Sequence, residues 1–261
     1  MKGKTCLMVA MVLLIGGWSI HAGESQYKVV KLLYKGWIKG SVTHSRTNLE
    51  IPDLEVDRDV KSCGAEPRRI QAVDIGANGA LLNAVVYLKD ITAGKGFMMP
   101  ATPVTLTQEH CDFQPHVQLV PPFSSIRIIN NDAILHSVHA FQFPLGQKFV
   151  LYPNSITYPA HTLFNIAMVA TRKESFQQLG EPGIVKTVCD AGHYWMTAYF
   201  VVMPHPYFAK VAQDGSFVID DVPPGKYTLV SWHEYFGTQE KAIQVKENQP
   251  VSVDFEYTSE L

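Results

Sequence analysis

The stretch TVCDAGHYWMTAYF, residues 187–200, places three side chains that bind soft metal ions within eight positions. Cys189, His193 and Met196 follow the spacing C-x3-H-x2-M. A thiolate, an imidazole and a thioether together suit copper, which alternates between two oxidation states. The β-branched and aromatic residues on both sides of this stretch favour strands. The three candidate ligands would therefore lie on a short loop at one end of a β structure.

Short runs rich in β-branched and aromatic residues recur along the chain, bounded by Gly, Pro, Asn or Asp. They include YKVVKLLY, NAVVYLKD, SIRIIN, LFNIAMVA, IVKTV, TAYFVVM and KYTLVSW. No segment keeps a sustained 3.6-residue apolar period, and RKESFQQL at 172–179 would form at most one or two helical turns. The sequence therefore predicts an all-β protein, built as an antiparallel sandwich or barrel.

Residues 1–22 combine two lysines with an apolar run that ends before Ala22, which is typical of a secretory signal peptide. The run is too short for a stable transmembrane helix. We therefore expect a periplasmic or secreted protein with no membrane insertion after signal removal. Removing the signal takes away two lysines and no acid, which changes the formal net charge from −2 to −4. Nucleic acid is accordingly not expected as a partner.

Three cysteines remain once Cys6 is removed with the signal peptide. In an oxidising compartment two of the three usually pair. Cys63 in KSCGAE and Cys111 in EHCDFQ both have polar, turn-like surroundings. We predict that these two form a disulfide, which leaves Cys189 unpaired.

A second imidazole is available in NNDAILHSVHAF, residues 130–141, from His136 or His139. Positions three apart on a strand face opposite sides, so only one of the two is expected to bind the metal. Asp132 is a candidate to organise the ligand loop by hydrogen bonding. Zinc is the competing ion, but it normally takes a harder fourth donor or a water. Met196 therefore favours copper.

NNDAILHS followed by CDAGHYWM resembles the cupredoxins, the family of plastocyanin and azurin, and the spacing also resembles the copper domain of cytochrome oxidase subunit II. That domain binds two coppers through a second cysteine four residues before the one that matches Cys189. Val185 occupies this position in the present chain, so one copper ion is expected. By this match the resemblance implies His136, Cys189, His193 and, as a weak axial donor, Met196 as ligands. We expect His193 to lie nearest to solvent and to be the exit path for electrons.

Longer stretches, from CDFQPHVQLV and from HPYFAKVAQDGSFVIDDVPPGKYTLVSWHE, resemble exported bacterial proteins described as plastocyanin-like or methylamine-utilisation-like. The resemblance implies a cupredoxin Greek-key β-sandwich over residues 104–203. It also implies a second small β-sandwich of the transthyretin or carboxypeptidase-regulatory type, in two parts, residues 36–90 and 204–258. The copper domain would be inserted into, or share strands with, this second sandwich. Two domains in tandem are the alternative.

These features predict a mononuclear copper protein that transfers single electrons to a redox partner such as a c-type cytochrome and is not an enzyme. Two alternatives stay open: a copper-binding or copper-delivery module, in which His139 offers a transient position, and a structural sandwich with a vestigial site. A hydrolase is not indicated, because no nucleophile-elbow motif is present. Four further histidines are expected to be structural: His116, His161, His205 and His233.

Overall fold

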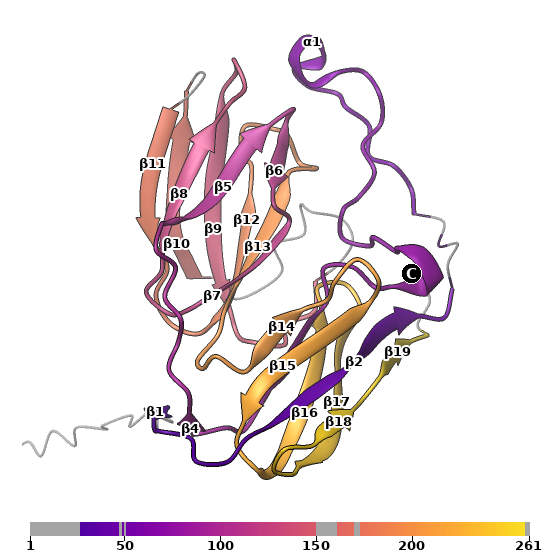
Figure 1. Cartoon of the computed structure of the whole chain (residues 1–261). Coiled ribbons are helices and arrows are strands. Elements are labelled where there is room, and N and C mark those ends of the chain that lie inside the picture. Colours follow the sequence, from indigo (N-terminus) through magenta and orange to yellow (C-terminus); the bar gives the residue numbers. More distant parts are fainter. Residues whose placement is uncertain (1–26, 47–48, 50, 150–160, 170–172, 259–261) are drawn as a thin grey trace, which may run out of the picture.

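Strands make up almost all of the regular structure in this computed structural model (Figure 1). The structure describes residues 27–258 except 47–48, 50, 150–160 and 170–172, so the predicted signal peptide lies outside the described residues. The predicted all-β class is confirmed. Within the described residues, no helix is long and apolar enough to cross a membrane.

Nineteen strands, one short helix and one 3-10 turn follow one another along the described part of the chain. They are β1 (Lys28–Val29), β2 (Gly36–His44), α1 (Val60–Cys63), the 3-10 turn η1 (Ala77–Gly79), β3 (Val85–Leu88), β4 (Ala93–Gly94), β5 (Val104–Glu109), β6 (Asp112–Gln114), β7 (Val117–Val120), β8 (Ser125–Asn130), β9 (His136–Phe143), β10 (His161–Met168), β11 (Lys173–Gln178), β12 (Gly183–Val188), β13 (Thr197–Val202), β14 (Phe208–Lys210), β15 (Ser216–Val222), β16 (Gly225–His233), β17 (Gly237–Val245), β18 (Pro250–Ser252) and β19 (Phe255–Tyr257).

Two sheets form a first sandwich, which lies in the upper half of Figure 1. A five-stranded sheet in the order β10-β9-β12-β13-β7 packs against a four-stranded sheet in the order β11-β8-β5-β6. Apolar residues from both sheets fill the space between them, among them Leu106, Phe113, Ile128, Val138 and Phe200. Burying such side chains contributes about 1.5–3 kcal/mol each to folding.

A second sandwich combines strands from both ends of the chain. One of its sheets has the order β14-β3-β16-β17, and in the other β15, β18 and β19 all pair with β2. Its core contains Ile38, Leu88, Phe217, Leu229 and Phe255. Strands β2 and β3 precede the first sandwich in the sequence and β14 to β19 follow it, so the chain leaves this sandwich and returns to it.

Strands β12 and β13 of the five-stranded sheet are buried on both faces, with all six residues of each strand buried. The edge strand β10 is mostly exposed or half-buried. Along β12, Val185 faces the first core, whereas Ile184 and Val188 pack with Trp232 of β16 in a third cluster between the sandwiches. One sheet thus contributes to two cores.

A buried ion pair also joins the two sandwiches. Nε2 of His116 contacts the Glu234 carboxylate, and its Nδ1 lies 2.9 Å from the carbonyl oxygen of Thr197. Burial alone lowers the pKa of the His116 imidazole and raises that of the Glu234 carboxyl, but the opposite charges reverse both effects. The pKa of His116 is therefore raised and that of Glu234 lowered. Both ring nitrogens donate hydrogen bonds, so His116 is an imidazolium.

Two segments differ from what their residues suggested. The one or two helical turns allowed for 172–179 are not formed by its described residues, because Lys173–Gln178 form edge strand β11, which pairs antiparallel with β8. The strand is stabilised by backbone hydrogen bonds to β8 and by the ion pair between Arg127 Nε and Glu174 Oε2 at 2.9 Å. Neither contact can be predicted from the polar residues of this segment alone. The run at 27–34 was expected to be a strand, but only Lys28–Val29 form one. This part of the run pairs with β4, which is itself only two residues long.

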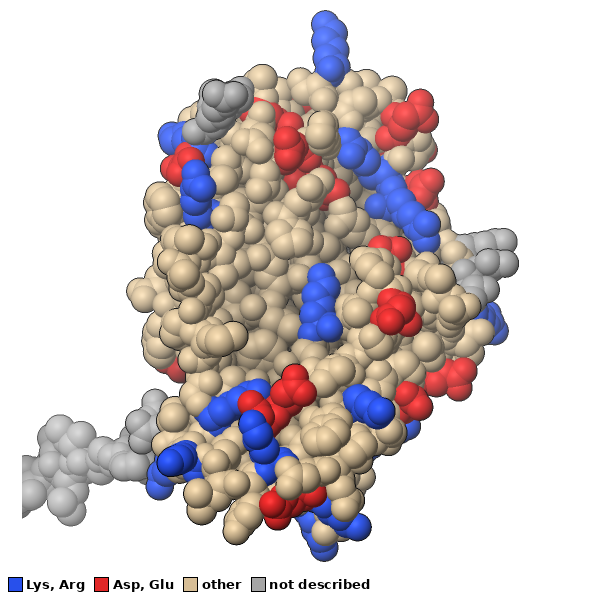
Figure 2. All heavy atoms as spheres, viewed as in Figure 1, with Lys and Arg blue, Asp and Glu red and all other residues tan. Residues whose placement is uncertain are grey.

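Acidic and basic side chains are scattered over the face of the molecule that Figure 2 shows, with broad uncharged areas between them. The exposed ion pairs of the protein include Lys35 with Asp221 at 2.6 Å and Lys89 with Glu240 at 2.9 Å. Such exposed pairs contribute little to stability, because water and salt screen them.

Candidate metal centre

Three metal-binding atoms converge at one end of the first sandwich. Nδ1 of His136 lies 3.1 Å from Nδ1 of His193. Sγ of Cys189 lies 3.9 Å from the first nitrogen and 3.6 Å from the second. The three residues are 0%, 0% and 6% exposed, respectively for His136, His193 and Cys189. The structure thus brings together three of the four residues predicted as ligands around one buried point.

Strand alternation places these side chains. His136 begins β9 and is fully buried. Cys189 follows β12 directly and continues the face of Val185 into the first core. His193 lies in the loop that joins β12 to β13. Two strand ends and one tight loop therefore supply the donors, and strand ends hold side chains more rigidly than long loops do.

The ligand loop closes on itself. The amide of Met196 donates a hydrogen bond to the carbonyl of His193 at 3.0 Å. Gly192 adopts φ +95°, a backbone conformation that favours glycine, and the side chain of Arg58 lies beside it. Met196 is fully buried in the same core as Cys189, and the ring of Trp195 lies 5.4 Å from that of His193.

Carboxylates hold the outer nitrogens of both histidines. Nε2 of His136 lies 2.9 Å from Oδ2 of Asp132, and Nε2 of His193 lies 3.0 Å from Oδ2 of Asp59. A carboxylate accepts, so each Nε2 carries the proton and each Nδ1 keeps a lone pair. The two lone pairs face each other at 3.1 Å and repel unless a proton or a cation lies between them.

The donor set fits a metal ion. Nitrogen and sulfur atoms that bind one ion at about 2.0–2.3 Å lie about 3–4 Å from one another, as these three donors do. Burial raises the pKa of the Cys189 thiol, although the Ser137 amide donates a hydrogen bond to Sγ at 3.4 Å. Burial also lowers the pKa of His193, and the neighbouring His136 adds to this effect. A metal ion that binds at this point displaces the thiol proton.

His139 does not belong to this cluster. Its Nδ1 lies 2.7 Å from Oδ2 of Asp190, and its Nε2 lies 3.1 Å from Oγ1 of Thr162. Both ring nitrogens are therefore engaged by other residues on the opposite side of β9 from His136. Of the two histidines that the sequence left open, the structure places His136 beside Cys189.

All four predicted ligands, His193 among them, are buried, so the expectation that His193 lies nearest to solvent stays a prediction. Its outward nitrogen contacts Asp59, which precedes it by 134 positions in the sequence and whose side chain is 44% exposed. Asp59 lies far in the sequence from both stretches that carry the predicted ligands, residues 130–141 and 187–200. The spacing of residues within these stretches therefore could not reveal that Asp59 covers His193.

The predicted disulfide between Cys63 and Cys111 is present, and Cys189 is free. Cys111 also helps to place Asp132, since the amides of His110 and Cys111 donate to the two Asp132 carboxylate oxygens at 2.9 and 2.8 Å. Burial raises the pKa of Asp132, but these two bonds and the contact with His136 lower it overall. Asp132 thus stays a carboxylate and orients His136, as the sequence suggested.

Sequence reasoning missed three residues that shape the centre. Asp59 holds His193, and Ser137 donates to the Cys189 sulfur. Asn130 donates to the carbonyls of Ile134 and Met168 at 2.9 and 2.8 Å and so fixes the loop before His136. The two asparagines that precede His136 were a usable sequence signal for Asn130. For Asp59 the only signal was its position close to Cys63 in the sequence.

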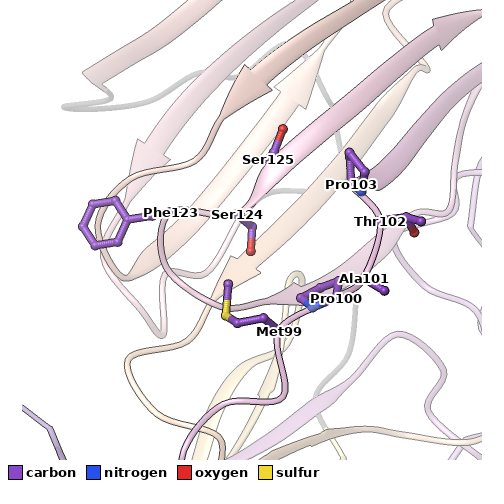
Figure 3. A pocket seen from close by; sticks show the side chains of 8 residues that line it. All are labelled: Met99, Pro100, Ala101, Thr102, Pro103, Phe123, Ser124 and Ser125. Carbon is purple, nitrogen blue, oxygen red and sulfur yellow. The ribbon is translucent and has the colours of Figure 1, made fainter.

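A cavity at the other end of the first sandwich is separate from the metal centre. It measures about 240 Å³ and is lined by residues 99–103 and 123–125 (Figure 3). These residues lie at the starts of β5 and β8, whereas the metal centre lies beyond the end of β8. The cavity therefore adds nothing to the chemistry of the three donors.

The sequence matches no protein-family model and no curated protein. Among solved structures, the chain is similar to amicyanin from Paracoccus versutus, with 14% identity and a TM-score of 0.30 over 41% of this chain and 86% of amicyanin. It is also similar to a purple cupredoxin from Nitrosopumilus maritimus, with 16% identity and a TM-score of 0.29 over 38% of this chain and 99% of that one. A copper-containing nitrite reductase from Thermus scotoductus shares 15% identity with a TM-score of 0.28, over 40% of this chain and only 23% of the reductase. At such TM-scores these similarities assign no function, and the geometry of the three donors carries the assignment.

Proposed function

We propose that the protein is an exported, mononuclear copper protein that transfers single electrons. The observation that carries this proposal is the convergence of two imidazole nitrogens and one cysteine sulfur, all buried, within 3.9 Å of one another. Two imidazoles with one thiolate are the donor set of copper sites that carry electrons.

Met196 supports copper over zinc. Its side chain is fully buried in the core that contains Cys189, where a thioether can act as the weak axial donor. Such long, weak axial donors belong to copper electron-transfer sites. Val185, four residues before Cys189, offers no second thiolate, which supports one copper ion rather than two.

Copper, once bound, supplies the one-electron couple between Cu(II) and Cu(I), and the chain supplies its environment. His136 and His193 present Nδ1 because Asp132 and Asp59 occupy their Nε2 protons. The Ser137 amide donates to the Cys189 sulfur and so moderates its charge. Rigid donors reduce the rearrangement that accompanies each electron, and the buried surroundings exclude water.

Export is supported by the disulfide between Cys63 and Cys111, because disulfides persist in oxidising compartments. We propose a periplasmic or secreted location and a redox partner protein such as a c-type cytochrome. We propose that this centre has no catalytic activity, since His136, Cys189 and His193 are all buried within the described part of the chain.

Titration of the mature protein with Cu(II), followed by optical and paramagnetic-resonance spectroscopy, tests the proposal. We expect one copper per chain and an intense visible absorption from thiolate-to-copper charge transfer. Cys189→Ser should remove this absorption. His161→Ala is the matched control, because His161 is an exposed histidine of β10, and it should leave the spectrum unchanged.

The same titration separates the two alternatives. Copper that binds but passes readily to a chelator would favour a copper-delivery module over a carrier of electrons. No stoichiometric binding would favour a structural sandwich with a vestigial site. The burial of both histidine ligands argues against rapid exchange, so we expect slow loss of copper.

A further inference from the structure

A segment outside the strands of the first sandwich covers the metal centre. We call residues 54–63 the cap; it ends in the short helix α1, which Figure 1 places at the top of the molecule. Leu54 and Val56 are buried in the same core as Cys189. The hydroxyl of Tyr194 donates to the carbonyl of Glu55. The cap is therefore packed onto the ligand loop rather than free.

The disulfide fixes the far end of the cap. Cys63 is bonded to Cys111, and the indole Nε1 of Trp195 donates to the Cys111 carbonyl at 2.9 Å. Trp195 itself packs against the ring of His193. The cap is thus attached on both sides of the histidine that it covers.

Asp59 departs from the role that its position suggests. It is the N-cap residue of α1, where an aspartate ordinarily accepts hydrogen bonds from helix amides. Its side chain makes no such bond, and its backbone is left-handed, with φ 50° and ψ 35°. The carboxylate instead reaches Nε2 of His193 at 3.0 Å. Asp tolerates this backbone conformation better than most residues, so the local geometry is compatible with its use against the histidine.

Two consequences for His193 follow from this contact. The carboxylate holds the proton on Nε2, so Nδ1 faces Cys189 as a lone pair. It also raises the basicity of the imidazole as a ligand. The side chain of Arg58, which lies against Gly192, closes the adjacent side of the loop. The centre is therefore incomplete without a residue that neither strand end provides.

We propose that Asp59 is a positioning residue of the metal centre, which fixes the tautomer of His193 and tunes the potential of the metal that this histidine binds. The inference rests on the proposed function for its effect on copper. Its effect on the His193 tautomer does not depend on any metal.

The experiment compares Asp59→Gly with Asp57→Gly. Glycine suits the left-handed backbone at position 59, so the first variant removes the carboxylate without backbone strain. Asp57 is exposed and lies in the same cap, so the second variant makes the same chemical change two residues away. Asp59→Asn completes the series, because asparagine keeps one acceptor oxygen and lacks the charge.

The first readout uses the metal-free protein. Long-range nitrogen–proton NMR of the imidazoles should show one tautomer of His193, with the proton on Nε2, in the wild type, in Asp57→Gly and in Asp59→Asn. Asp59→Gly should show a mixture of tautomers. A His193 ring with its proton on Nδ1 and none on Nε2 in the wild type, or the same tautomer in both glycine variants, would overturn the proposal.

The second readout uses the copper-loaded protein. Loss of such an outer hydrogen bond typically weakens metal binding by about 10–100-fold. The carboxylate charge stabilises Cu(II) more than Cu(I), and each tenfold loss of affinity for Cu(II) alone raises the reduction potential by about 59 mV. We expect this rise in Asp59→Gly, a smaller one in Asp59→Asn and none in Asp57→Gly; equal potentials in the two glycine variants contradict the proposal. If the wild type bound no copper, the proposed function would fail, and the NMR result would still decide the role of Asp59.

Discussion

Two buried histidines in this protein each contact a carboxylate through Nε2, but the partners of their Nδ1 atoms differ. Between the sandwiches, His116 contacts Glu234 through Nε2 and donates from Nδ1 to the Thr197 carbonyl. At the metal centre, His193 contacts Asp59 through Nε2, but its Nδ1 faces another histidine nitrogen and a thiol sulfur. Both rings are buried and both have a carboxylate partner.

The difference is whether the second ring nitrogen already has a protein acceptor. The backbone oxygen beside His116 makes that ring a fixed cation in an ion pair. The second nitrogen of His193 has no carbonyl to receive a proton and meets two other donors of electron pairs instead. A buried histidine with a carboxylate is thus a structural element in one place and a proposed metal ligand in the other, and the partner of the second nitrogen makes the difference.

The largest effect should come from the ion pair between the sandwiches. Glu234→Gln removes one charge and leaves the imidazolium of His116 buried without its partner, which typically costs about 3–5 kcal/mol. Denaturant unfolding of the metal-free protein measures this loss. Glu240→Gln is the control, because Glu240 is half exposed and pairs with exposed Lys89, and it should change stability little. A stability of Glu234→Gln equal to that of the control would show that the contact with His116 is dispensable.

Copper should stabilise the wild type by an amount of similar size. A ligand that binds only the folded state contributes about 2.7 kcal/mol at a concentration one hundred times its Kd. Thermal unfolding with and without Cu(II) measures this gain, and a chelator should abolish it. His136→Gln should lose the gain, whereas Glu234→Gln should keep it despite its lower stability. Equal copper gains in wild type and His136→Gln would remove His136 from the ligand set.

The pH dependence of stability offers a third test, at a histidine without a charge. Burial lowers the pKa of His233 from 6.5 to about 4. The positive charge of His116 also lowers this pKa, whereas the negative charge of Glu234 raises it in part. In the unfolded chain His233 is therefore protonated as the pH falls below about 6.5, whereas in the folded chain it stays neutral until about pH 4. The contribution of neutral His233 is present above pH 6.5 and is lost as the pH falls toward 4. The loss amounts to up to about 3 kcal/mol.

His233→Asn should flatten this acid limb. Asn keeps an acceptor for the amides of Tyr235 and Phe236, which donate to Nδ1 of His233 at 3.3 Å, and it has no proton to gain. Urea unfolding at several pH values between 6.5 and 4 compares the two proteins. An acid limb as steep in the variant as in the wild type would assign the pH dependence to other groups.

The smallest effect should come from His139, which lies three positions after His136 and has both nitrogens engaged. His139→Ala should leave the copper spectrum unchanged and should weaken copper binding much less than the loss of a ligand does, because its ring bonds to Asp190 and Thr162 and to none of the three donors. Isothermal titration with Cu(II) measures the affinity. Loss of the charge-transfer band in this variant would transfer the ligand role from His136 to His139.

The loop around Cys189 and His193 was predictable because three soft donors occur together there, and strand alternation correctly separated His136 from His139. The disulfide was predictable because two of the three cysteines that follow the predicted signal peptide have polar surroundings. Asp59 was not, because its contact with His193 depends on how a distant segment packs, and no spacing rule spans 134 positions. Likewise β11 is a strand because β8 pairs with it, which its own residues do not encode.

The sheet that lies between the two cores bears on how the chain can be cut. Ile184, Val188, Tyr199 and Val201 face the second sandwich and pack with Trp232 there. A fragment limited to residues 104–203 would expose this apolar face to water and would associate or unfold. We therefore expect the intact chain to lose both sandwiches in one cooperative transition. A shortened protein that consists of the first sandwich alone would need polar residues in place of the apolar ones on that face.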